Sequence, residues 1–110
     1  MQRDIQLYQE YAQILIDNVP CDFKKITSDC ILSAKNAFSS SERTVEDPVG
    51  ELSTFGAKAK DAYREFKLLI ELRDFMVSQG QPPWTGIRFT LHSDGKFTTE
   101  FSYDPLEDDL

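Results

Sequence analysis

The last third of the chain alternates apolar and polar residues on both sides of an Asp94-Gly95 pair, a pattern typical of a β-hairpin. If the loop held only these two residues, apolar side chains of one strand would lie opposite polar side chains of the other. A three-residue loop over residues 93–95 pairs Leu91 with Phe97 and gives Gly95 the left-handed position that closes such loops. Because a slip by one residue turns a whole strand face over, the sequence predicts the three-residue loop.

This register also predicts the outward face of the hairpin. Arg88 lies opposite Glu100 and Thr90 lies opposite Thr98, two pairs that are each favourable by about 0.2–1 kcal/mol. The inward pairs are Leu91 with Phe97, Phe89 with Thr99 and Ile87 with Phe101.

Two amphipathic helices are predicted before the hairpin, because apolar residues recur at helical spacing. The first covers residues 4–18 and is ended by Pro20, and the second runs from Ser53 or Thr54 to Gln79 with Gly80 as its cap. The faces expected to pack on the core are Ile5, Tyr8, Ala12, Leu15, Ile16 and Val19 in the first helix and Ala59, Ala62, Tyr63, Phe66, Leu69, Ile70, Phe75 and Met76 in the second. The charged residues of the second helix, including Asp61, Glu65 and Arg73, are expected on its other faces.

Two strands are predicted between the helices. Residues 23–32 alternate, with Ile26, Ser28, Cys30 and Leu32 in one phase. After a turn near residues 34–36, a second strand is predicted over residues 37–45, although its serine run suits a half-exposed strand and a loop equally. The order α-β-β-α-β-β predicts an α+β two-layer sandwich, with two helices on an antiparallel sheet of about four strands.

The length and charge of the chain restrict its class. The 110 residues suffice for a single domain, residues 1–110, of which residues 104–110 form an acidic tail. A formal charge of −7 disfavours direct binding to nucleic acid or anionic membranes and leaves a basic protein partner open. Asp4 and Glu10 interrupt any secretory signal, and Cys21 and Cys30 are expected to be free thiols, so a cytoplasmic location is expected.

The sequence contains little that indicates catalysis. His92 is the only histidine, and a general base would need a nucleophile and an orienting carboxylate beside it, so we expect a solvated histidine at a strand end. Cys21, Cys30 and His92 lack a fourth ligand and the short spacing of a zinc site. No phosphate-binding loop, dinucleotide motif or nucleophile elbow occurs, so neither a cofactor nor a catalytic residue is predicted. The lone Trp84 either pins the connection between helix and hairpin onto the core or anchors an interface.

Several sequence segments resemble the YezG-like immunity (antitoxin) proteins of bacterial polymorphic toxin systems. The hairpin carries most of the likeness, in Pro83-Trp84-Thr85, Phe89-Thr90-Leu91, Ser93-Asp94-Gly95-Lys96-Phe97, and Phe101 followed by Tyr103-Asp104. The opening LYQEYAQILIDNVP is similar to the first helix of that family. The resemblance covers about two-thirds of the chain and is weakest over residues 21–56.

The resemblance implies a small bacterial cytoplasmic protein that binds the C-terminal domain of a secreted toxin, often a nuclease, and blocks it without turnover. A basic nuclease surface would suit an acidic inhibitor. Residues carrying carboxylates on polar surface are expected to contact the toxin: Glu46 and Asp47 in a loop, Glu100 on the outward strand face, and Asp104, Glu107, Asp108 and Asp109 in the tail. Two other classes remain open, a non-inhibitory adaptor or chaperone for a secreted effector and a small hydrolase using His92 or the carboxylates.

Overall fold

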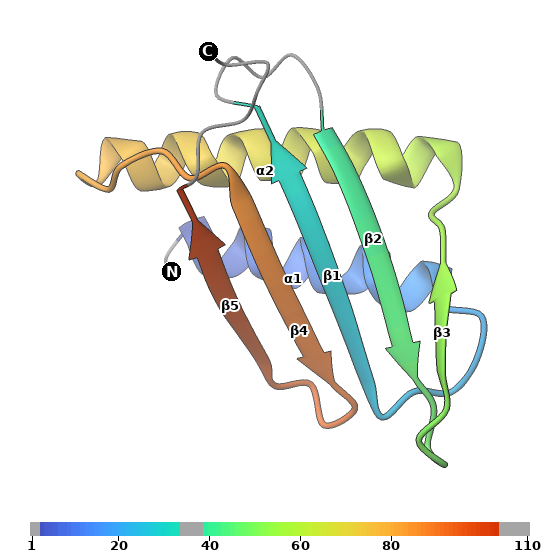
Figure 1. Ribbon diagram of the computed structural model, residues 1–110. Helices are drawn as coiled ribbons and strands as arrows, with labels where there is room; N and C mark the ends of the chain where they lie inside the picture. Colours follow the sequence, from blue (N-terminus) through green and yellow to red (C-terminus); the bar gives the residue numbers. More distant parts are fainter. Residues whose placement is uncertain (1–2, 34–38, 104–110) are drawn as a thin grey trace.

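The computed structural model describes residues 3–33 and 39–103 of the chain and shows two helices packed on one face of a five-stranded sheet (Figure 1). The elements are α1 (Arg3–Asn18), β1 (Lys25–Leu32), β2 (Ser39–Glu46), β3 (Leu52–Phe55), α2 (Ala59–Ser78), β4 (Gly86–His92) and β5 (Phe97–Ser102). Every strand pair is antiparallel, and the strand order is β3-β2-β1-β4-β5. The predicted α+β two-layer class is therefore confirmed.

The predicted number of strands and element order are wrong, because a short strand lies where the second helix was expected to begin. β3 pairs with residues 43–46 of β2, and α2 begins only at Ala59. The start of α2 is fixed by a distant residue: Asn18 at the end of α1 accepts the Lys58 N–H at 2.8 Å and donates to Asp61 at 2.9 Å. Since this cap lies 40 residues away in the sequence, local pattern does not locate the helix start.

The hairpin follows the predicted register. Leu91 pairs with Phe97, and Arg88 pairs with Glu100. The loop is closed by the Gly95 N–H, which donates to the His92 carbonyl at 2.9 Å, and Gly95 has a φ of 89°. The left-handed backbone that the sequence predicted at this glycine is therefore present.

The strands between the helices also follow the prediction in part. In β1 the predicted inward residues Ile26, Ser28, Cys30 and Leu32 are all buried. β2 ends one residue later than expected, and the predicted turn at residues 34–36 lies outside the described residues.

The predicted core faces of both helices are partly wrong. In α1 the buried residues are Leu7, Tyr11, Ile14 and Leu15, whereas Ile5 and Ile16 are exposed. In α2 the buried residues are Asp61, Glu65, Leu69, Leu72 and Arg73, whereas Tyr63 is exposed. The α2 face turned to the sheet thus carries three charged groups that were expected at the surface. Their burial is tolerated because each of them has a partner inside the protein.

The aromatic residues fill the layer between sheet and helices. Phe89 lies with its ring centroid 5.1 Å from those of Tyr11 and Phe97. Trp84 is fully buried and packs against Phe101 at 5.5 Å between ring centroids. Of the two roles considered for Trp84, the structure therefore supports the one within the core.

Candidate partner-binding surface

The face of the sheet turned away from the helices has no element over it within residues 3–33 and 39–103 (Figure 1). Side chains alternate between the two faces of a strand, so every second register row places one outward residue per strand side by side. One such row carries Glu42, Asp29, Arg88 and Glu100 on β2, β1, β4 and β5. Three carboxylates and one guanidinium therefore lie in a line across four strands.

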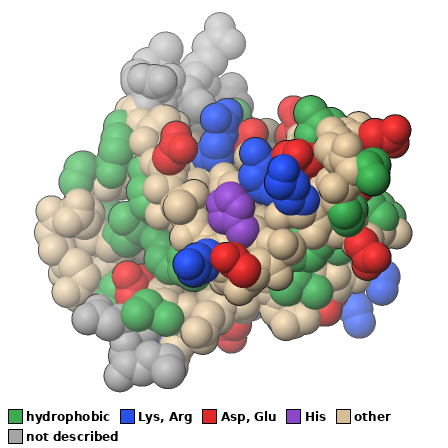
Figure 2. All heavy atoms as spheres, turned by 90° about the horizontal axis from the view of Figure 1, so that it is seen from below, with side chains coloured by type: hydrophobic (Ala, Val, Ile, Leu, Met, Phe, Trp, Pro, Cys, Tyr) green, Lys and Arg blue, Asp and Glu red, His purple; other side chains and the backbone are tan. Residues whose placement is uncertain are grey.

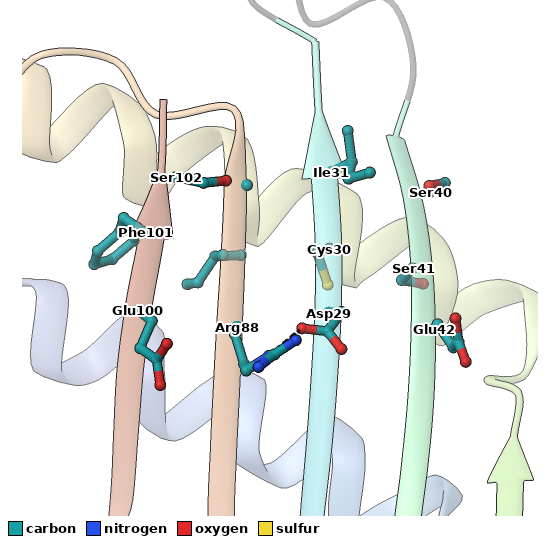
Figure 3. A pocket seen from close by; sticks show the side chains of 12 residues that line it. Asp29, Cys30, Ile31, Ser40, Ser41, Glu42, Arg88, Glu100, Phe101 and Ser102 are labelled. Atoms are coloured by element: carbon teal, nitrogen blue, oxygen red, sulfur yellow. Dashed lines mark hydrogen bonds and ion pairs between the residues drawn. The ribbon is translucent and has the colours of Figure 1, made fainter. Parts of the chain in front are cut away.

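The single guanidinium of this acidic row is held by one of its carboxylates. Arg88 Nε donates to Asp29 Oδ1 at 2.6 Å, and the two side chains point toward each other in Figure 3. This hydrogen bond, assisted by the charge of Asp29, raises the pKa of Arg88, so the guanidinium stays ionised. Glu42 and Glu100 flank the pair, and the row as a whole carries an excess of negative charge.

The four residues of the acidic row also line a shallow depression of about 550 Å³ (Figure 3). Gly86 lies between Ile31 and Ser102 in the next outward-facing register row, and its missing side chain hollows the sheet there. A Cβ at Gly86 would lie 2.3 Å from Ser102 Oγ, so the glycine lets the neighbouring strand side chain lie across it. Ile31 is 42% exposed and, with Phe101, adds apolar side chains to the lining of the depression.

A row of threonines crosses all five strands on the other side of the acidic row. Its members, in strand order, are Thr54, Thr44, Thr27, Thr90 and Thr98. These β-branched side chains are short and uncharged, so this part of the face is flat, with methyl and hydroxyl groups. The surface combines a flat platform with a charged line, which suits contact with another folded protein more than enclosure of a small ligand.

The structure separates the residues that the sequence singled out for partner binding. Glu100 lies outward in the acidic row, as its predicted register requires. Glu46 is the last residue of β2, two outward-facing register rows away, and forms ion pairs with Lys24 at 3.7 Å and Lys25 at 3.8 Å.

Asp47 lies in the turn after β2 and stabilises that turn. Its carboxylate accepts the backbone N–H groups of Val49 at 3.0 Å and Glu51 at 2.8 Å. The tail residues Asp104, Glu107, Asp108 and Asp109 lie outside the described residues.

Sequence reasoning missed Asp29 and Glu42 as members of the surface. The alternation of β1 does place Asp29 outward, opposite in phase to the buried Ser28 and Cys30. What local pattern lacks is the pairing of β1 with both β2 and β4, which brings residues 29, 42, 88 and 100 into one row.

His92 lies at the end of the sheet where the hairpin turns, and basic and acidic side chains surround it there (Figure 2). It is exposed and lies opposite Lys25 in the register.

Among the described residues, no group of three or more His, Cys, Asp or Glu side chains is placed to hold a metal ion. No helix in the described part of the chain is long and apolar enough to cross a membrane.

A polar cluster lies buried between the sheet and α2. The Tyr11 hydroxyl lies 2.7 Å from Ser28 Oγ and 2.9 Å from Cys30 Sγ, and it donates to Glu65 at 3.0 Å. Glu65 also forms an ion pair with Arg43, and both side chains are almost wholly buried. Burial raises the pKa of the Cys30 thiol above its usual value, so it stays protonated and is a poor nucleophile at neutral pH.

Cys21 is exposed and, like Cys30, carries a free thiol. The two cysteines are therefore not joined, as the sequence predicted.

The sequence matches the family described as Immunity protein YezG-like over residues 5–109. The match includes residues 21–56, the segment with the weakest likeness to the family. No match is found among the curated proteins. The chain belongs to the YezG-like immunity protein family.

Proposed function

We propose that this protein neutralises a cognate toxin by binding it, and that the toxin is a nuclease with a basic substrate-binding surface. Membership of an immunity protein family supports the first part. The observation that carries the second part is the acidic row of Asp29, Glu42 and Glu100 on the uncovered sheet face.

Negative charge on this sheet face would both compete for the substrate-binding groups of the toxin and speed the encounter of the two proteins. A nuclease holds the phosphates of its substrate with Lys and Arg side chains, so a line of carboxylates competes for the same groups. Opposite charges also raise the rate at which two proteins meet, and rapid capture limits damage by an active toxin. The net charge of −7 adds to this attraction.

The proposed contact surface centres on the acidic row. Glu46 lies on the same sheet face and extends the surface toward the hairpin turns. The tail residues Asp104, Glu107, Asp108 and Asp109 stay predictions as further contacts. Asp47 is the weakest member of the predicted set, because its carboxylate is already engaged by two backbone N–H groups.

The proposed mode of action is stoichiometric and involves no chemical step. The thiol of Cys30 is buried and protonated, so it is a poor nucleophile. It donates to Glu65 and thereby helps to hold β1 on α2. We therefore expect the activity of the toxin to fall linearly with added protein and to vanish at a one-to-one ratio.

The test begins with capture of partners from a lysate of the source cell on the tagged protein, followed by mass spectrometry. The captured protein is then assayed for cleavage of plasmid DNA and of transfer RNA, with and without this protein. Loss of cleavage at one equivalent supports the proposal. Capture of a secreted protein whose activity is unchanged would instead indicate a non-inhibitory adaptor, and capture of no nuclease would overturn the assignment of the toxin class.

A further inference from the structure

Residues 39–42, the first half of β2, form an open edge among the described strands of the sheet. β3 pairs only with residues 43–46 of β2, and no described strand pairs with residues 39–42 on that side (Figure 1). The edge formed by β2 and β3 is therefore stepped, because the described part of the chain leaves residues 39–42 of β2 unpaired on that side.

The hydrogen-bond alternation shows which groups this edge presents. The Leu32 N–H donates to Thr85 and the Ser93 N–H donates to Lys24, so even-numbered residues of β1 bond toward β4. Odd-numbered residues of β1 consequently bond to β2, and their partners there are the even-numbered ones. The backbone N–H and C=O of Ser41 therefore point to the open edge.

The chain that follows β3 does not continue the strand along this edge. It is drawn toward α1 by Asn18, which accepts the Lys58 N–H at 2.8 Å. Natural edge strands are usually blunted by lysine, proline or a bulge, and residues 39–42, Ser-Ser-Ser-Glu, have neither lysine nor proline.

A partly enclosed cavity of about 280 Å³ lies beside this edge, between β2 and α2. Its walls combine the apolar side chains of Ala57, Ala62, Phe66 and Leu69 with the buried Arg43–Glu65 pair. Arg43 is 6% exposed, and its Nε has no hydrogen-bond partner among the described residues. A buried donor without an acceptor is costly, so an incoming acceptor would be stabilised there.

We propose that an extended segment of the toxin adds to β2 as a strand at Ser41 and inserts one side chain into this cavity. The inference rests on the proposed function, since the toxin is the partner. The Ser41 N–H and C=O would bond to the main chain of the segment, as in other cases of strand addition. The inserted side chain would have an apolar stem and a neutral acceptor, that of Gln or Asn, because Glu65 already balances the charge of Arg43.

The first test fills the cavity and leaves the backbone edge intact. Ala62→Phe places a ring at a residue that lines the cavity, and Ala59→Phe places the same ring one turn earlier on α2, outside the cavity lining. Both alanines are exposed, so both variants should fold, which thermal unfolding checks. The probe is the toxin domain captured above, and we expect Kd to rise at least tenfold for Ala62→Phe and to stay unchanged for Ala59→Phe.

The second test measures amide hydrogen exchange of the unsubstituted protein by NMR, with and without that toxin domain. We expect the Ser41 amide to exchange at least tenfold more slowly in the complex. The Thr99 amide, at the free edge of β5 on the opposite side of the sheet, should not change.

The outcomes separate this inference from the proposed function. Normal inhibition with unchanged Ala62→Phe affinity and an unprotected Ser41 amide would overturn strand addition and leave the proposed function standing. Failure to capture or inhibit any nuclease would overturn both. A dimeric free protein with Ser41 already protected would show that a second copy occupies the edge, which would also overturn the inference.

Discussion

At the scale of single residues, the fold depends on charged groups that are buried with their partners. Glu65 and Arg43 form an ion pair inside the protein, and the Arg73 guanidinium donates to the backbone carbonyls of Leu32 at 3.0 Å and Trp84 at 2.9 Å. Burial of a charge is tolerated only when such partners are present. These residues therefore join β1, β2 and α2 as much as the apolar core does.

Removing one member of the Arg43–Glu65 pair should be strongly destabilising. We expect Glu65→Leu to lower the free energy of unfolding by about 3–5 kcal/mol, because Arg43 is left as an uncompensated buried charge. Urea unfolding measures the change. The double variant Arg43→Met with Glu65→Leu should recover most of the loss, and a double variant no more stable than Glu65→Leu alone would contradict this account.

The buried thiol and phenol predict loss of stability in alkali. Burial raises the pKa of Cys30 and of Tyr11 above their usual values, so the folded state holds these protons more tightly than the unfolded chain does. Their contribution is complete below the unfolded pKa and is lost as pH rises through the folded pKa. Urea unfolding between about pH 8 and pH 11 should show falling stability. Cys30→Ala should reduce the slope and Cys21→Ala should not; equal slopes would contradict the assignment.

At the scale of elements, patterns that are local in the sequence were predictable and long-range ones were not. The register of β4 and β5 follows from alternation within 15 residues and was predicted correctly. The start of α2 depends on Asn18, and its buried face depends on Arg43, both outside the helix. Periodicity of apolar residues therefore predicted that α2 exists and that Leu69 faces the core, but not that Asp61, Glu65 and Arg73 are buried on the same side.

A valine at the hairpin turn should destabilise the protein through backbone strain alone, without a steric clash. Gly95 has a φ of 89°, and a Cβ there would meet nothing within 4 Å. Gly95→Val should therefore destabilise by about 1–3 kcal/mol through the cost of a left-handed β-branched residue. Gly56→Val is the control, since Gly56 has equally open surroundings without a positive φ. Thermal unfolding compares the two, and a Gly95→Val protein that melts with its parent would contradict the loop assignment.

At the scale of the whole molecule, the arrangement separates a structural layer from an exposed one. The two helices cover one sheet face and leave the other to the acidic row, the threonine row and the depression (Figures 1 and 3). The sequence predicted that Glu100 lies outward, and the structure adds Asp29 and Glu42 from strands up to 71 residues away along the chain, from residue 29 to residue 100. Only strand order, which is a property of the complete sheet, assembles this surface.

The central claim is that the acidic sheet face, rather than net charge alone, captures the toxin. Stopped-flow association with the captured toxin domain tests it by comparing Asp29→Asn/Glu42→Gln/Glu100→Gln with the helix-face control Glu10→Gln/Asp17→Asn/Asp74→Asn. Each set removes three negative charges from exposed residues.

We expect the sheet-face set to slow association about tenfold at low salt and the helix-face set to have a much smaller effect. Equal slowing by both sets, or no slowing by the sheet-face set, would contradict the claim.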